Sequence, residues 1–342
     1  MMRNPCFLSR FLFSFSFMFL LVFSALAQNK SLSSGIQLLA FGSCNKHDFP
    51  QPIWKPILED KPDVFVWLGD IVYGDTPDMD LLRRKYQAQK EIPDYVSLRQ
   101  RSKILGIWDD HDYGINDGGK YFAQKRSSQQ VLLDFLDEPV NSSRRKREGA
   151  YDSYYFGEGE QQVKVILLDA RYHRDTLYRE NRRYLANDTG SLLGEEQWLW
   201  LERELRENTA QVTVIASGIQ MIPTEHAFEK WQNFPKERKK LLDLIADSKV
   251  KNPILISGDR HIAEISRLKD KKFPHGLFEI TSSGMTHTWG EYREEYNPYR
   301  VGKLIASLHY GTLFFDWENK QVQVAIKGTE GQIFLEQGIP LR

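Results

Sequence analysis

Seven residues that could bind a metal or transfer a proton follow directly on short apolar runs of the chain. They are Cys44, Asp70, Asp109, Asp110, His111, Asp259 and His261. Short, nearly continuous apolar runs bounded by turn residues are typical of buried β-strands. Because ligands bind beyond the carboxyl ends of the strands in open α/β sheets, we expect these side chains to gather at one edge of the fold.

The predicted cluster contains the carboxylates of Asp70, Asp110 and Asp259. Carboxylates held together repel one another, and each raises the pKa of its neighbour unless a cation lies between them. We therefore expect the cluster to be a metal site. Carboxylate oxygens favour hard cations such as Ca²⁺, Mg²⁺ or Mn²⁺.

Softer or anionic donors are available from Cys44, Tyr73 and His261. A thiolate, a phenolate and an imidazole favour a transition metal, and the phenolate points to Fe³⁺. A mixed site, in which Asp70 bridges one transition ion and one or more hard ions, accounts for both kinds of ligand. Cys44 and Cys6 are the only cysteines, and Cys6 lies in a predicted leader, so no intrachain disulfide is expected. A buried inert thiol remains the alternative for Cys44.

Alternating strands and helices are expected to position these side chains. The predicted strands are Ile36–Phe41, Val64–Leu68, Ile104–Trp108, Val163–Leu168, Val212–Ala216 and Ile254–Ile256, and the predicted helices are Asp78–Lys90, Gln124–Phe135, Gly194–Arg206 and Pro235–Ala246. Such alternation indicates an α/β sandwich. Nearer the C-terminus the pattern predicts a β-hairpin of Gly311–Trp317 and Gln321–Ile326, then a strand at Gln332–Leu335. No repeat or linker divides residues 28–342, which favours a single domain.

Residues 1–27 have the pattern of a secretory signal peptide. Arg3 and Arg10 flank the start of the apolar run Phe11–Phe23, and a small-x-small cleavage pattern ends at Ala27. We therefore expect an exported protein, periplasmic or secreted after cleavage near this point. An uncleaved anchor is the alternative, although the run is shorter than the ~20 residues that a spanning helix needs. No later segment is expected to span a membrane.

The chain of 342 residues contains 46 Lys and Arg residues and 46 Asp and Glu residues. Without the predicted leader, whose only charged residues are two arginines, the net charge is about −2. This balance provides no charge field for binding nucleic acid, so no stable nucleic-acid partner is expected. A content of 41% hydrophobic and 27% charged residues fits a globular protein with a sizeable core.

Seven segments form a combined motif pattern in chain order: Phe41–Cys44, Trp67–Tyr73, Trp108–Gly114, Leu167–Tyr172, Leu193–Trp198, Ser257–His261 and Thr281–Gly284. Together they closely resemble the alkaline phosphatase D (PhoD-like) family of metallophosphoesterases, and the similarity covers nearly all of residues 28–342. The resemblance implies an α/β fold, a four-layer αββα sandwich of two mixed sheets flanked by helices, with a metal centre at their common edge. Residues 28–342 would then be one PhoD-like metallophosphatase catalytic domain.

The resemblance also implies hydrolysis of phosphate monoesters or diesters with Fe³⁺ and Ca²⁺, while Mn, Mg and Zn are the other metals to consider. It assigns metal binding to Cys44, Asp70, Tyr73, Asp109, Asp110, Asp259 and His261. His111 falls on the position of a catalytic histidine.

Three positions depart from the broader superfamily. Cys44 stands in place of an opening Asp-x-His motif, and Gly258–His261 stands in place of a closing Gly-His-x-His motif. The middle metal-binding histidine has no clear counterpart, and Gln220 or Ser217 lies nearest to its position. These changes shift the donors toward oxygen, so an ordinary pair of transition metals is not expected.

The expected nucleophile is a metal-bound hydroxide, because a cation lowers the pKa of the water it binds. His111 would stabilise charge on the phosphoryl group or protonate the leaving oxygen, and Asp112 would orient its ring. Arg260 and Arg171 are candidates for a bidentate phosphate clamp. We expect a small phosphate-ester substrate and a monomeric protein.

Other functions fit the same residues. The chain could be a secreted phospholipase- or nuclease-type phosphodiesterase, or a non-catalytic, metal-stabilised binder of phosphorylated ligands. It could also be a cysteine hydrolase using Cys44 and a histidine, which iodoacetamide would inactivate and a chelator would not. The aromatic segment Trp289–Tyr299 either lines a substrate mouth or simply packs. Structural or surface roles are expected for five further histidines, His173, His226, His275, His287 and His309.

Overall fold

The computed structural model describes Met1, residues 31–32, residues 35–289 and residues 295–342. The predicted signal peptide, apart from Met1, lies outside the described residues, and so does part of the segment Trp289–Tyr299. Among the described residues, no helix has the length and apolar character needed to cross a bilayer.

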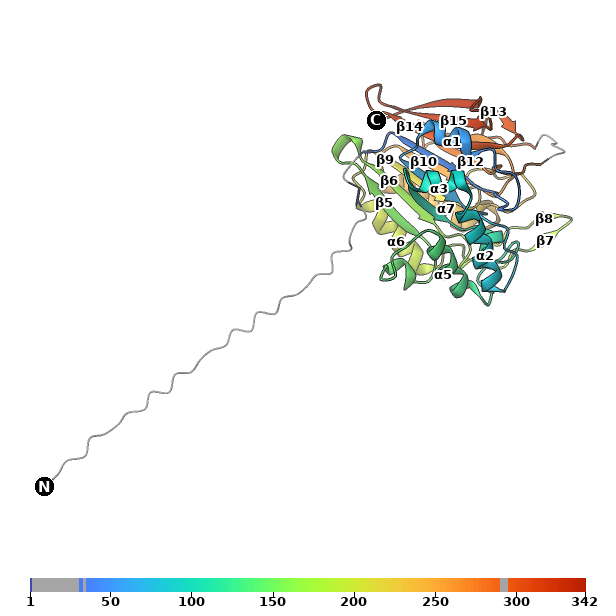
Figure 1. Cartoon of the computed structure of the whole chain (residues 1–342). Coiled ribbons are helices and arrows are strands. Elements are labelled where there is room, and N and C mark those ends of the chain that lie inside the picture. The colour runs from blue at the N-terminus through green and yellow to red at the C-terminus, as the bar shows by residue number, and fades with distance from the viewer. Residues whose placement is uncertain (2–30, 33–34, 290–294) are drawn as a thin grey trace.

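Two mixed β-sheets form the centre of the fold (Figure 1). The larger sheet has eight strands in the order β1 (Ser31–Leu32), β5 (Asp152–Phe156), β6 (Val163–Leu168), β9 (Val212–Ser217), β10 (Pro253–Ser257), β12 (Leu277–Ser282), β11 (Ala263–Leu268) and β13 (Arg300–Ile305). The smaller sheet has six, in the order β16 (Ile333–Pro340), β15 (Gln321–Gly328), β14 (His309–Asp316), β2 (Leu38–Gly42), β3 (Val64–Leu68) and β4 (Lys103–Ile107). A separate hairpin joins β7 (Arg179–Glu180) and β8 (Arg183–Tyr184).

Each sheet combines a set of parallel strands with antiparallel neighbours. β6, β9, β10 and β12 run parallel to one another in the larger sheet, as do β2, β3 and β4 in the smaller one. The helices are α1 (Trp54–Asp60), α2 (Met79–Lys90), α3 (Pro93–Arg99), α4 (Asp110–Tyr113), α5 (Lys125–Phe135), α6 (Glu195–Arg206) and α7 (Pro235–Asp247). The predicted α/β fold of two mixed sheets with flanking helices is confirmed.

Side chains on the two faces of β6 show how the layers are held together. Val165 and Leu167 belong to the core that contains the inward faces of both sheets. Ile166 and Leu168 belong to a second core, where they pack with α6 and α7 residues such as Leu201. Because successive strand residues point to opposite faces, a continuous apolar run is what a strand covered on both sides requires.

Helices on the smaller sheet pack through an aromatic cluster. Trp67 of β3 lies against Trp54 of α1, Tyr95 of α3 and Phe135 of α5, with ring centroids 5.4, 5.7 and 6.5 Å away. The indole nitrogen of Trp67 also donates to the Tyr95 hydroxyl over 3.0 Å. The burial of these large rings fixes the helices on this face of the sheet.

Every strand and helix predicted above is present, with bounds that differ by a few residues at most, except that the last strand continues to Pro340. The predictions missed α1, α3 and α4, which are too short to display a helical period. They also missed the strands β1, β5, β7, β8, β11, β12 and β13. In β11 and β12, buried Glu264 and Glu279 interrupt the apolar pattern.

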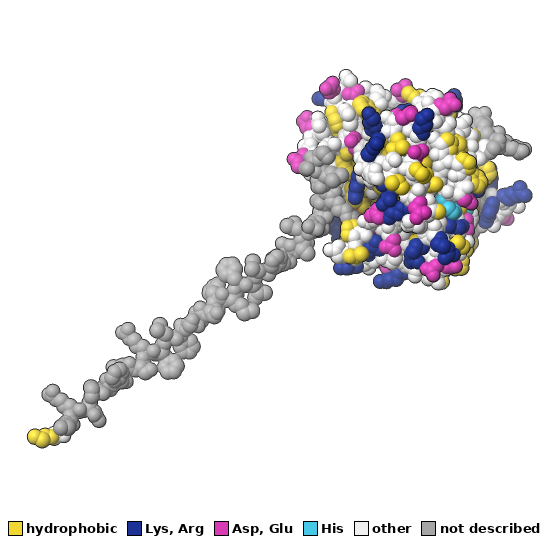
Figure 2. All heavy atoms as spheres, in the orientation of Figure 1, with side chains coloured by type: hydrophobic (Ala, Val, Ile, Leu, Met, Phe, Trp, Pro, Cys, Tyr) yellow, Lys and Arg dark blue, Asp and Glu magenta, His cyan; other side chains and the backbone are white. Residues whose placement is uncertain are grey.

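The carboxyl ends of the parallel strands from both sheets meet at one edge of the molecule, and glycines permit the close approach. A Cβ atom on Gly258, after β10, would lie 2.5 Å from Ser43 Oγ and 2.6 Å from the Leu68 carbonyl oxygen. A Cβ on Gly218, after β9, would lie 2.4 Å from Asp109 Oδ1. Small residues at these turns therefore let loops of the larger sheet touch loops of the smaller sheet. Elsewhere on the face drawn in Figure 2, acidic and basic side chains are interspersed.

Candidate metal centre and catalytic site

Four of the expected site residues adopt a left-handed backbone. The φ angles are 58° at Cys44, 49° at Asp70, 70° at Asp259 and 53° at His261. Non-glycine residues rarely adopt this conformation, and it persists only where the surrounding structure holds it. These residues follow the ends of β2, β3 and β10, so each of the three strands ends in a turn that re-directs a potential ligand.

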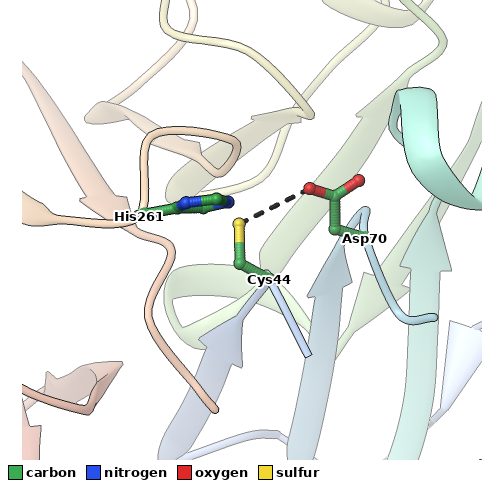
Figure 3. Close-up of side chains that lie close together, drawn as sticks. All are labelled: Cys44, Asp70 and His261. Carbon is green, nitrogen blue, oxygen red and sulfur yellow. Dashed lines mark hydrogen bonds between the residues drawn. The ribbon is translucent and has the colours of Figure 1, made fainter. Parts of the chain in front are cut away.

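Cys44, Asp70 and His261 form a first group of candidate ligands (Figure 3). Their ligand atoms all lie within 4.8 Å of one another, and Cys44 Sγ donates to Asp70 Oδ2 over 3.5 Å. Tyr73 extends the group, because its hydroxyl lies 2.9 Å from His261 Nε2. Thiol, carboxylate, imidazole and phenol groups from distant parts of the chain are thus gathered in one place.

Carboxylates dominate two further groups. Ligand atoms of Asp70, Asp110 and His111 lie within 4.8 Å of one another, as do those of Asp109, Asp110 and Asp259. Asp70 is common to the first two groups, and Asp110 is common to the second and third. The donors therefore form one continuous cluster rather than separate patches.

The pKa values of the buried carboxyl groups, and one buried oxygen without a partner in the described part of the chain, indicate whether this cluster fits bound cations. Burial, reinforced by neighbouring carboxylates, raises the pKa of Asp70 well above its ordinary value and that of Asp259 to about 8. Burial likewise raises the pKa of Asp109, and Asp109 Oδ2 is buried with no hydrogen-bond partner among the described residues. Cations would stabilise the ionised forms and occupy such an oxygen, so the donor set fits metal ions.

Cys44 does not have the surroundings of a nucleophile. Its side chain is fully buried, and burial together with the charge of Asp70 raises the pKa of the thiol. Nucleophilic cysteines instead have a depressed pKa and are partly exposed. This environment does not support the cysteine-hydrolase alternative.

His111 is held by Asp75, a residue that the sequence analysis did not single out. Its Nδ1 lies 2.8 and 2.9 Å from the two Asp75 carboxylate oxygens. Burial alone would lower the pKa of His111, but the hydrogen bond that it donates to Asp75 and the nearby carboxylates raise it to about 9. The ring also packs on Tyr73, with centroids 4.1 Å apart. Because Nδ1 is occupied, Nε2 is the nitrogen available to a substrate.

The expectation that Asp112 orients His111 must be corrected. The Asp112 carboxylate accepts hydrogen bonds from the backbone N–H groups of Asp109 over 2.7 Å and Ile71 over 3.0 Å. It therefore stabilises the start of α4 and the turn after β3. Orientation of the His111 ring belongs to Asp75 instead.

The expectation that Arg171 clamps the phosphate must also be corrected. Its side chain is 0% exposed. Nε donates to Asp109 Oδ1 over 2.7 Å, and Nη1 donates to Glu229 Oε2 over 2.6 Å. The guanidinium is thus occupied by two buried carboxylates, and its charge helps to lower the pKa of Asp110. Arg171 acts on the site through these acids and does not reach the cavity.

Arg260 lines the cavity, and a hydrogen-bond chain holds it. Nη1 donates to Gln220 Oε1 over 3.1 Å, and Nη2 donates to Glu295 Oε2 over 2.7 Å. Gln220 Nε2 in turn donates to Glu264 Oε1 over 2.8 Å. Gln220, one of the two nearest counterparts of the missing superfamily histidine, therefore supports an arginine.

His287 lies in the site, although the sequence analysis expected a structural or surface role. Its Nε2 lies 2.9 Å from the Tyr73 hydroxyl, and its ring centroid lies 4.4 Å from that of His261. The available signal was the run Leu277–Ser282, a buried strand followed by polar residues. Recognising that strand would have placed His287 just beyond another carboxyl end of the larger sheet.

A cavity of about 230 Å³ opens beside the carboxylates. Six of the residues that line it are Asp110, His111, Asp259, Arg260, His261 and Trp289. The Trp289 indole donates to the Arg260 carbonyl oxygen over 2.9 Å, so this aromatic residue both packs and lines the cavity. A phosphate ester entering here would meet His111 and Arg260 next to the candidate metal ligands.

Comparison with known proteins identifies the family. Residues 39–320 match the model of the PhoD-like phosphatase family. The chain belongs to the PhoD-like phosphatase family. This PhoD-like chain is 22% identical over 299 residues to alkaline phosphatase D of Bacillus subtilis (strain 168), an alignment covering 71% of this chain and 48% of the relative. It thus spans about half the length of the curated relative it matches.

Solved structures share the fold of this PhoD-like chain. The structure of PhoD superposes with a TM-score of 0.69 at 17% identity, covering 90% of this chain and 69% of that one. A dimetal phosphatase from Danio rerio has a TM-score of 0.56 at 13% identity, covering 90% of this chain and 100% of that one. GAP50, the anchor in the inner membrane complex of Plasmodium, has a TM-score of 0.59 at 13% identity, covering 90% of each chain. The fold therefore occurs in a phosphatase and in an anchor protein, so function must be argued from the site.

Proposed function

We propose that this chain is an exported, metal-dependent phosphatase or phosphodiesterase that hydrolyses small phosphate esters in the cavity beside Asp110 and His111. One observation carries the proposal: thiol, phenol, imidazole and carboxylate donors form one cluster beside this cavity, which Asp110, Asp259 and His261 line next to a histidine held by Asp75. Membership of the PhoD-like phosphatase family supports it. We also propose that the protein acts as a monomer and has no stable nucleic-acid partner.

The donors divide by chemistry between two kinds of ion. Cys44, Tyr73 and His261 would hold Fe³⁺, because thiolate, phenolate and imidazole favour a transition metal. The carboxylates would hold Ca²⁺ or another hard cation, with Asp70 shared between the two kinds. When bound, these cations would make water available as a nucleophile near neutral pH and neutralise charge on phosphoryl oxygens.

The chain's own residues would then bind the ester and move its proton. Arg260, held by Gln220 and Glu295, would donate hydrogen bonds to phosphoryl oxygens. Nε2 of His111 would donate a proton to the leaving oxygen or stabilise charge on the phosphoryl group. Asp75 keeps the proton on Nδ1 and so preserves this ring orientation.

Metal removal tests the function most directly. We expect purified protein to hydrolyse 4-nitrophenyl phosphate or bis(4-nitrophenyl) phosphate, and a chelator to lower that rate by at least ~10-fold, because the cations organise the site. The rate should return when Fe³⁺ and Ca²⁺ are restored. Hydrolysis that is indifferent to chelation would contradict the proposal. Binding of phosphate esters without turnover by metal-loaded protein would instead favour a non-catalytic binder.

The iron assignment has its own measurement. Thiolate and phenolate bound to ferric iron should give a visible charge-transfer band, and Cys44→Ser should weaken and shift it because the sulfur donor is lost. Ser97→Ala is a control, since the Ser97 hydroxyl on α3 donates to the Pro93 carbonyl oxygen over 3.0 Å and belongs to none of the candidate ligand groups. A fully metal-loaded protein without a visible band, or a band unchanged in Cys44→Ser, would refute iron at this position.

A further inference from the structure

A second cavity, of about 500 Å³, adjoins the catalytic cavity. Asn116, Asp117, Arg179 and Tyr184 line both. A ligand can therefore extend from Asp110 and His111 into the second cavity within one cleft. Its volume lies in the range of roughly 300–1,000 Å³ that is usual for sites of small organic molecules.

Apolar and aromatic side chains are presented to this second cavity. Tyr121 is 73% exposed and Ile115 is 50% exposed, and both line it together with half-buried Phe122. Large apolar groups left exposed in a concave surface favour contact with a ligand over packing within the chain. Lys120 lies 5.1 Å from the centre of the Tyr121 ring.

Apart from Arg179, the charged side chains in the cavity walls have hydrogen-bond or ion-pair partners within the protein. Asp175 forms an ion pair with Lys120, and Arg174 Nε lies 3.1 Å from Glu229 Oε1. Asp117 accepts a hydrogen bond from the Tyr184 hydroxyl. A group seated against these walls does not need a charge of its own, because the charged side chains already have partners.

Arg179 is the exception, and it stands at the junction of the two cavities. Its guanidinium lies 5.2 Å from the centre of the Tyr184 ring, and no carboxylate of the described residues forms an ion pair with it. It belongs to the β7–β8 hairpin, which projects from the body of the molecule (Figure 1) and carries exposed Arg182 and Arg183 as well. Figure 2 shows basic side chains gathered at this projection. A guanidinium at the junction suits an oxygen of the phosphoryl group.

We propose that the second cavity binds the ester group of the substrate, and that this group carries an uncharged aromatic ring that packs on Tyr121 while Arg179 contacts the phosphate. This assignment rests on the proposed function, because it takes the catalytic cavity to hold the phosphoryl group. It makes Tyr121 and Arg179 specificity-determining residues for aryl phosphate esters.

Phosphonates test the assignment without turnover, since their P–C bond takes the place of the scissile ester bond. Calorimetric titration of the metal-loaded full-length protein should give a dissociation constant about 10-fold lower for phenylphosphonate than for methylphosphonate. In Tyr121→Ala this ratio should fall to about 2-fold. Tyr178→Ala is the matched control, because Tyr178 is an exposed tyrosine (54%) next to Arg179 in the sequence but does not line the cavity. The control should keep the wild-type ratio.

Arg179→Ala tests the contact with the phosphate separately from the packing of the ring on Tyr121. It should weaken both phosphonates by a similar factor, because both present the same anionic group to the junction. Equal wild-type affinities for the two phosphonates, or a ratio unaffected by Tyr121→Ala, would overturn the ring assignment. A loss confined to phenylphosphonate in Arg179→Ala would overturn the role of Arg179.

Failure of this inference is distinguishable from failure of the proposed function. A wild-type protein that hydrolyses phosphate esters but binds both phosphonates equally refutes the ring cavity and leaves the function intact. A metal-loaded protein that hydrolyses no phosphate ester refutes the function, while the phosphonate ratio still decides whether the cavity selects a ring.

Discussion

Replacing His111 with alanine is expected to lower kcat for phosphate-ester hydrolysis by about 10²–10⁴-fold, the usual range for a lost general acid or base. The ring reaches the cavity, and Asp75 binds Nδ1 over 2.8 Å, so Nε2 is presented to the substrate. Steady-state kinetics with 4-nitrophenyl phosphate and elemental analysis of the same samples would measure the effect.

Controls separate catalysis from folding in this experiment. His275→Ala is the matched variant, because His275 is exposed beside Pro253, at the end of β10 opposite to the site. It should leave kcat unchanged. Asp75→Asn should produce part of the loss seen with His111→Ala, because it weakens the contact that orients the ring. Unaltered turnover in His111→Ala with intact metal content would exclude the catalytic role.

Arg171→Leu is expected to destabilise the protein by about 3–5 kcal/mol, because it leaves buried carboxylates without their partner. Arg171 contacts Asp109 and Glu229 at 2.6–2.7 Å, and all three side chains are at most 2% exposed. Urea unfolding of the metal-loaded protein measures the change in the free energy of unfolding.

Two further variants show whether the loss of stability in Arg171→Leu comes from its buried contacts. Arg171→Lys keeps the charge but not the planar fork, so its effect should be smaller than that of Arg171→Leu. Arg206→Leu removes a surface arginine that is 52% exposed and pairs with Glu202 on α6, and it should change stability by less than ~1 kcal/mol. Equal stabilities for Arg171→Leu and the wild type would show that Asp109 and Glu229 do not depend on the arginine.

Much of the architecture was predictable because its signals are local. A strand that is covered on both faces needs an apolar residue at every position, as Val64–Leu68 and Val163–Leu168 have. Polar residues directly after such runs had to lie at the carboxyl edge of a sheet. This reasoning predicts that Cys44, Asp70 and Asp259 lie at one edge of the fold, where the structure has them.

Contacts between loops could not be predicted from local sequence patterns. Asp112 is next to His111 in the sequence, but its carboxylate binds backbone N–H groups. The fold of the loop after Asp70 brings Asp75 to the His111 ring instead. Glu229 carries no motif, and it meets Arg171 because a loop of the larger sheet crosses the edge there.

By itself, the sequence determined which residue types end each strand, and therefore that thiol, carboxylate and imidazole donors would share one edge of an α/β fold. Only the tertiary structure decided which of those groups face the cavity, that Arg171 is enclosed by acids, and that His287 joins Tyr73. Strand and turn preferences act over a few neighbouring residues. The relative placement of two sheets depends on how the whole core packs, so partners 62 and 214 residues apart become visible only once it has folded.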